Sequence, residues 1–62
     1  MKKKENQDVR DKARIEDVPY WMIAKEVGIT ASTFSVWLRT EMEPERKNRV
    51  LAAIDAVAAR EA

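Results

Sequence analysis

The side chains in this chain that could do chemistry are its cations. Arg46, Lys47 and Arg49 stand close together, and Arg39 precedes them by a short stretch that contains a proline. Guanidinium and ammonium groups bind phosphate, and a guanidinium can also make a bidentate contact with guanine. Twelve basic and eleven acidic residues leave a formal net charge of +1. A basic surface therefore requires that the fold segregate the two signs of charge.

Enzymatic and metal chemistry have few candidate residues. The chain contains no histidine and no cysteine, so the commonest general base, the commonest metal ligand and any thiolate site are absent. Carboxylates such as Glu41 and Glu45 accompany no glycine-rich phosphate loop, and we interpret them as a solvated helix start. We therefore expect a protein that is not an enzyme, with no metal, cofactor or small-molecule substrate.

The length and composition indicate one small folded domain. The chain has 62 residues, and 45% of them are apolar, too many for a disordered chain whose charges nearly cancel. No apolar run approaches the length that spans a membrane, and Met1–Gln7 lacks the apolar segment of a secretory signal. We expect a soluble, cytoplasmic protein without a membrane partner.

Two predicted helices joined by a tight turn occupy the stretch Pro19–Arg39. The first is predicted over Tyr20–Val27, and Gly28 stops it because a left-handed residue costs glycine least. Thr30 is the predicted cap of the second helix, Ala31–Arg39. Helical spacing turns one side of that second helix toward the core (Phe34, Trp37 and Leu38) and leaves the other side outside (Ala31, Ser32, Ser35, Val36 and Arg39).

Further segments complete a domain predicted at residues 8–60. A helix is predicted over Asp8–Glu16, and Asn6 or Gln7 could begin it. It ends before Pro19 because proline disfavours helical backbone in the residue before it. The last helix begins near Pro44 and runs to about Ala59, with an apolar stripe of Val50, Leu51, Ile54, Val57 and Ala58. Residues 1–7, MKKKENQ, are predicted to form a flexible basic tail. Its lysines, Lys2 to Lys4, are either an arm that reaches DNA phosphates or a solubilising terminus, and we favour the terminus.

The run from Val9 to Ile54 resembles the small helix-turn-helix proteins of phages and integrative elements, in the broad lambda-repressor and Cro-like group. Three segments carry the resemblance: VPYWMIAKEVGIT, TFSVWLR and EMEPERK. The resemblance implies an all-α fold, a compact four- or five-helix bundle. Its second and third helices would form the helix-turn-helix that reads DNA.

The resemblance also implies which residues contact DNA. Ser32, Ser35, Val36 and Arg39 would face the base edges of the major groove. Thr30, Ala31 and Thr33 would lie near the DNA backbone at the helix N-terminus. On the same hypothesis, phosphates are met by Lys25, Arg39, Arg46, Lys47 and Arg49, with the polar tip of Tyr20 as a further contact. One short helix covers only a few base pairs, so a homodimer on a two-fold double-stranded DNA site is expected.

The hypothesis is thus a small transcriptional regulator of repressor type, of phage or mobile-element origin. An architectural or excision factor would share the same sequence features. A protein-interaction module that kept the bundle without DNA binding is the main alternative. The near-zero net charge, the apolar Val36 on the second helix of the pair and the alanine-rich last helix support that alternative.

Overall fold

The computed structural model describes residues 5–61 of the 62-residue chain. Four α-helices and no strand are present in this part of the chain: α1 (Gln7–Ile15), α2 (Tyr20–Val27), α3 (Ala31–Leu38) and α4 (Pro44–Glu61). The predicted all-α class is confirmed, with four helices. Each predicted helix is present, and α1, α3 and α4 differ from their predicted bounds by one or two residues.

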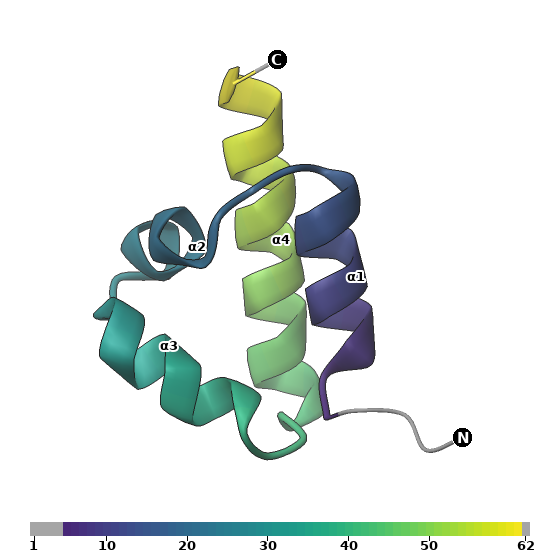
Figure 1. Ribbon diagram of the computed structural model, residues 1–62, viewed down its shortest axis with the longest axis vertical. Helices are drawn as coiled ribbons and strands as arrows, with labels where there is room; N and C mark the ends of the chain where they lie inside the picture. The colour runs from purple at the N-terminus through teal and green to yellow at the C-terminus, as the bar shows by residue number, and fades with distance from the viewer. Residues whose placement is uncertain (1–4, 62) are drawn as a thin grey trace.

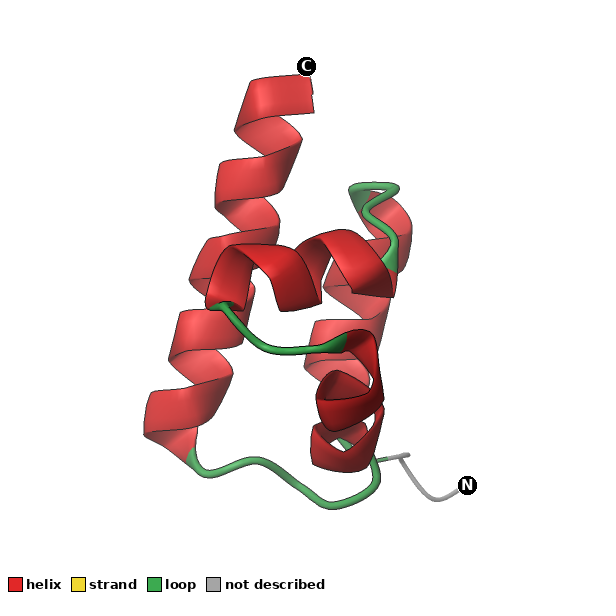
Figure 2. Cartoon of the chain, turned by 90° about the vertical axis from the view of Figure 1, so that its left-hand side faces the viewer, coloured by secondary structure: helices red, strands yellow, loops and turns green. Residues whose placement is uncertain are grey.

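The helices form two layers. Helices α1 and α4 lie side by side, and α2 and α3 cover one side of this pair, as Figures 1 and 2 show. Helix α2 crosses α4 steeply, and α3 then leads back toward the start of α4. The radius of gyration of the Cα atoms is 10.9 Å. A folded chain of this length has a radius of about 10.5 Å, so the molecule is compact.

The core lies between the two layers. Its largest fully buried side chains are Phe34 from α3, Ile23 from α2, Val9 from α1, and Ile54, Val50 and Val57 from α4. The predicted stripe on α4 is confirmed for Val50, Ile54 and Val57, whereas Leu51 and Ala58 are only partly buried. Ala24 is buried in α2, which has the close contact with α3 and α4 that a small residue permits. Met42 is also buried, although we expected only a break in periodicity there.

Helices α1 and α2 are each followed by a residue in the left-handed conformation. Gly28 has φ 96° and ψ 30°, and the N–H groups of Gly28 and Ile29 both donate to the carbonyl of Ala24 at 2.9 Å. After α1, Asp17 has φ 57°, and the N–H of Val18 donates to the carbonyl of Ala13 at 2.8 Å. These bonds satisfy carbonyls that have no partner within the helix. The predicted stop at Gly28 is therefore confirmed.

The N-terminal segment departs from its prediction. Residues 1–7 were expected to form a flexible tail, and Lys2–Lys4 lie outside the described residues. Gln7, one of the two residues that we expected could begin the helix, is the first residue of α1, whereas Asn6 is fully buried instead of lying in a tail. Asn6 is ordered by contacts with residues more than thirty positions away along the chain, which no local pattern can indicate.

None of the helices in the described part of the chain is long and apolar enough to cross a membrane.

Candidate nucleic-acid interface

The side of α3 that faces away from the core is exposed to solvent. Phe34 and Leu38 are buried, and this fixes which side of α3 faces the core. Thr30 caps the helix, since its Oγ1 accepts a hydrogen bond from the N–H of Thr33 at 3.1 Å. All six residues that were predicted to approach DNA from this helix are exposed: Ala31, Ser32, Thr33, Ser35, Val36 and Arg39.

No carboxylate lies on α3 itself, whose sequence is ASTFSVWL. The positive end of the helix dipole at Ala31 therefore meets no acidic side chain from its own first turn. The polar groups on the exposed side are the hydroxyls of Ser32, Thr33 and Ser35, followed by the guanidinium of Arg39 at the C-cap. Val36 adds an apolar side chain that is 56% exposed.

The ion pairs of the structure separate the cations into two groups. Lys12, Arg14, Lys47 and Arg60 each contact a carboxylate. Within residues 5–61, no ion pair involves Arg10, Lys25, Arg39, Arg46 or Arg49. The guanidinium of Arg10 donates instead to the backbone carbonyls of Glu5 and Leu38. Four of these five residues were predicted to contact DNA, and Arg10 was not.

Arg46 is held against α3 by an aromatic ring. Its Cζ lies 4.3 Å from the centroid of the half-buried Trp37 ring, within the range of a cation–π interaction. The contact joins the first turn of α4 to the last turn of α3. It places a guanidinium beside the end of α3 that also carries Arg39.

Lys47 has a different environment from its neighbours in the sequence. Its Nζ lies 3.2 Å from Asp8 Oδ1 and also pairs with Glu41. The hydrogen bond that Lys47 donates to Glu41 is the main reason that the pKa of Lys47 is raised, although desolvation opposes it. The pKa of Glu41 is lowered, first by its hydrogen bond with Lys47 and then by the backbone N–H of Asn6. Lys47 therefore links α1, the α3–α4 loop and α4, and its charge is already matched.

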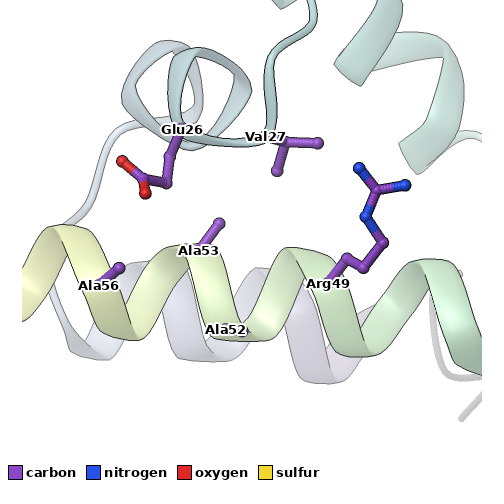
Figure 3. Close-up of a pocket in the computed structure, with 6 residues that line it drawn as sticks. All are labelled: Glu26, Val27, Arg49, Ala52, Ala53 and Ala56. Carbon is purple, nitrogen blue, oxygen red and sulfur yellow. The ribbon is translucent and has the colours of Figure 1, made fainter.

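Arg49 lines a shallow groove of about 390 Å³ between α2 and α4 (Figure 3). The floor consists of small side chains from α4 and Val27 from α2. Glu26 lies at the other end of the groove, but its carboxylate pairs with Arg60 at 2.7 Å. The guanidinium of Arg49 points toward the side on which α2 and α3 lie.

The remaining two predicted contacts lie elsewhere. Tyr20 is partly exposed, and its ring packs edge-on against Phe34 with the centroids 5.5 Å apart, so it covers the edge of the core. Lys25 lines a separate hollow with Trp21 and Arg60, near the C-terminal end of α4. The structure thus brings Arg39 and Arg46 together at the C-terminal end of α3 and leaves Lys25 apart from them.

Sequence reasoning missed one residue of this region, Asn6, whose carboxamide binds the backbone at the end of α3. The available signal was weak. Asparagine tolerates the left-handed conformation and is favoured beside helix starts, and Asn6 does precede α1. Nothing local indicated that its side chain would turn away from α1, where it makes no cap hydrogen bond.

Among residues 5–61, no three potential histidine, cysteine or carboxylate ligands gather in a cluster that could hold a metal ion. Comparison of the chain with protein-family models, with curated proteins and with solved structures finds no match.

Proposed function

We propose that this protein binds double-stranded DNA as a small regulator of repressor type, with α2 and α3 acting as a helix-turn-helix. In such a motif the second helix enters the major groove and its exposed side chains meet the base edges. One observation carries the proposal. The exposed side of α3 has hydroxyls and no carboxylate, and it ends at Arg39 and beside Arg46, whose guanidinium groups form no ion pair within the described chain.

Each exposed side chain on α3 has a chemically suitable partner in DNA. Arg39 can form the bidentate contact with guanine that gives strong discrimination between bases. Ser32 and Ser35 can bond to bases or phosphates, and the exposed Val36 can pack on a thymine methyl group. Thr30, Ala31 and Thr33 stand at the N-terminus of α3, where backbone N–H groups favour a phosphate.

Arg46 and Arg49 are the proposed phosphate contacts from α4, because their guanidinium groups form no ion pair within residues 5–61. Lys47 is the weakest of the expected phosphate contacts, since binding a phosphate would compete with Asp8 and Glu41. Its proposed role is to hold the loop before α4 in place. Binding as a homodimer on a two-fold site would supply the interface area that one small module lacks.

Two acidic substitutions on the exposed side of α3 test the proposal. A variant with Ser32→Glu and Ser35→Glu places two carboxylates where the DNA should lie. The control carries Ile15→Glu and Ala59→Glu, which add the same charge at exposed positions of α1 and α4. Like charges brought together in an interface cost several kcal/mol, so the α3 variant should bind a labelled duplex pool at least about tenfold more weakly than the control. Equal affinities for the two variants would contradict the proposal.

A protein-interaction module is the second candidate, and exposed apolar side chains favour it. Trp21 is 59% exposed and Ile15 is 75% exposed, both outside the proposed DNA surface. Single exposed apolar residues are ordinary in soluble domains, so they support this function less than the charge arrangement supports DNA binding. If the unmodified chain, the α3 variant and its control all fail to bind DNA, the interaction module becomes the preferred function.

A further inference from the structure

Asn6 is the one fully buried polar side chain among the described residues. Its Nδ2 donates to the carbonyl oxygens of Trp37, Leu38 and Thr40 at 3.3, 3.2 and 2.8 Å. Its Oδ1 accepts from the N–H of Met42 at 2.8 Å. The donor and the acceptor atoms of the carboxamide thus all form hydrogen bonds with the backbone of one short stretch, residues 37–42.

Capping of α1 does not account for this arrangement. Asn6 has φ 58° and ψ 38°, a left-handed conformation that asparagine tolerates better than most residues, and its side chain makes no cap bond to α1. The backbone N–H of Asn6 instead donates to Glu41 Oε1 at 2.8 Å, a further bond to the same stretch. Both the main chain and the side chain of Asn6 therefore serve the connection between α3 and α4.

The hydrogen bonds from Asn6 reach the C-terminal end of α3, where the helix has no further N–H groups to pair with its carbonyls. The last carbonyls of a helix have no partner within it, and two of those that Asn6 binds belong to the final residues of α3, Trp37 and Leu38. Arg39 lies between Leu38 and Thr40, whose carbonyls are both held. The Asn6 side chain consequently holds the peptide units on either side of Arg39, and the guanidinium of Arg10 adds a second hydrogen bond to the Leu38 carbonyl at 3.2 Å.

The same bonds reach a second cation. Trp37 is bonded through its carbonyl to Asn6, and its ring lies under the guanidinium of Arg46. A change in the direction of the last turn of α3 would therefore move the Trp37 ring and, with it, the surface on which Arg46 lies. At this end of α3, Arg39 is the C-cap residue, Arg46 lies on the Trp37 ring, and Arg10 donates to the Leu38 carbonyl.

We propose that Asn6 is a positioning residue for this surface, whose buried carboxamide sets the directions in which Arg39 and Arg46 present their guanidinium groups. It does not contact DNA itself. The role in DNA recognition rests on the proposed function, whereas the positioning of the two side chains is a property of the free protein.

The first test uses the free protein and the substitution Asn6→Gly, which removes the carboxamide and keeps a residue that accepts φ 58°. It is made in an Asp17→Gly background, because glycine at that left-handed position should offset part of the lost stability. The control is Asn48→Gly in the same background, which weakens α4 at an exposed position through lower helix propensity. Glu41→Ala is a milder second variant, which removes the acceptor for the Asn6 N–H and with it the exposed ion pair to Lys47. Lys47→Met removes that ion pair, together with the one to Asp8, but keeps the acceptor, and it therefore separates the two effects.

NMR of the folded proteins supplies the first measurement. In Asn6→Gly, amide exchange at Met42 should be faster by about tenfold relative to the control, as expected for the loss of a buried hydrogen bond. The side-chain resonances of Arg39 and of the Trp37 indole should shift, and Glu41→Ala should shift them in the same direction by less. Shifts confined to residues 5–7, with Arg39 and Trp37 unchanged in both variants, would overturn the proposal.

The second measurement uses DNA, at a temperature where every variant is folded. Asn6→Gly should reduce the preference for the selected duplex over a scrambled one by roughly tenfold, within what one guanidinium–base contact supplies. Arg39→Ala should then cost much less in that variant than in the unmodified chain, because the two residues act together. A merely structural role predicts a lower unfolding midpoint with unchanged preference, as for Asn48→Gly. If the unmodified chain binds no DNA, the proposed function fails, and the NMR result still decides whether Asn6 positions the two arginines.

Discussion

The guanidinium of Arg46 lies over the ring of Trp37, 4.3 Å from its centroid, so the first turn of α4 holds a cation against the last turn of α3. A cation–π pair of this kind fixes the plane of the guanidinium while leaving its N–H edge available to an acceptor. On the proposed function, that acceptor is a DNA phosphate.

If Arg46 contacts a phosphate, its removal should weaken binding to all sequences alike. Arg46→Gln should lower the affinities for specific and scrambled duplexes by the same factor and reduce the salt slope of binding by about 0.9. Fluorescence anisotropy at several salt concentrations measures both quantities. The matched control is Arg14→Gln, which removes an exposed arginine on α1 that pairs with Asp11. A loss seen only on the specific duplex would make Arg46 a base contact instead.

Arg39 should behave in the opposite way. If it reads a base, Arg39→Ala should weaken binding to the selected duplex by about 1–3 kcal/mol and leave binding to scrambled DNA much less affected. Competition between the two duplexes measures the difference directly. Equal losses on both would show that Arg39 contacts only phosphate.

Gly28 should be needed for the turn between α2 and α3. Its φ of 96° is unfavourable for other residues, although a Cβ at this position would meet no atom within 4 Å. Gly28→Val should therefore destabilise the protein by about 1–3 kcal/mol through backbone strain, since the added Cβ itself has room. Urea unfolding measures this change, and an unchanged midpoint would contradict the left-handed turn.

Asp17 is predicted to give the reverse result. It occupies the corresponding place after α1 with φ 57° and is exposed. Asp17→Gly should stabilise the protein by up to about 1 kcal/mol, because glycine enters the left-handed region without the penalty that a Cβ brings. A lower midpoint of thermal unfolding for this variant would indicate that the Asp17 side chain has a stabilising role that its contacts do not reveal.

Stability should fall in acid because of the carboxylates around Lys47. The pKa of Glu41 is lowered from its ordinary 4.5, mainly by the hydrogen bond from Lys47. For Asp8, desolvation by burial is the largest single influence and raises the pKa, but hydrogen bonds from Lys47 and the Val9 N–H outweigh it, so the pKa is lowered from 3.8. A lowered folded-state pKa stabilises the fold above the ordinary value, and this contribution is lost as the pH falls through the folded-state pKa.

Thermal unfolding at a series of pH values below 5 measures this effect. The midpoint should decrease as Glu41 and Asp8 take up protons, and Lys47→Met should make the decrease shallower. The control is Lys12→Met, which removes a lysine that pairs with Asp55, about two helical turns further along α4 than Lys47. The same acid dependence in Lys47→Met and in the unmodified chain would show that the cluster does not contribute.

The sequence predicts the helices and the turn well because their determinants are local. Gly28 and Thr30 bracket the turn, and the spacing of Phe34 and Leu38 fixes the buried side of α3. Once the buried side is known, helix geometry fixes which residues of α3 are exposed. Asn6, Met42 and the pairing of Lys47 could not be predicted, because each depends on which distant segments meet in the folded chain. Periodicity carries no information about a single asparagine that bonds to residues 31 to 36 positions away.

Selection of bound duplexes from a random DNA pool, sequenced after washing at two salt concentrations, is the most direct test of sequence-specific DNA binding by this protein. We expect a two-fold symmetric motif that survives the higher salt, with half-sites about one helical turn apart. In Arg39→Ala, the motif should lose information at one position. Enrichment without a motif, lost at the higher salt, would reduce the function to phosphate binding, and no enrichment at either salt would contradict DNA binding altogether.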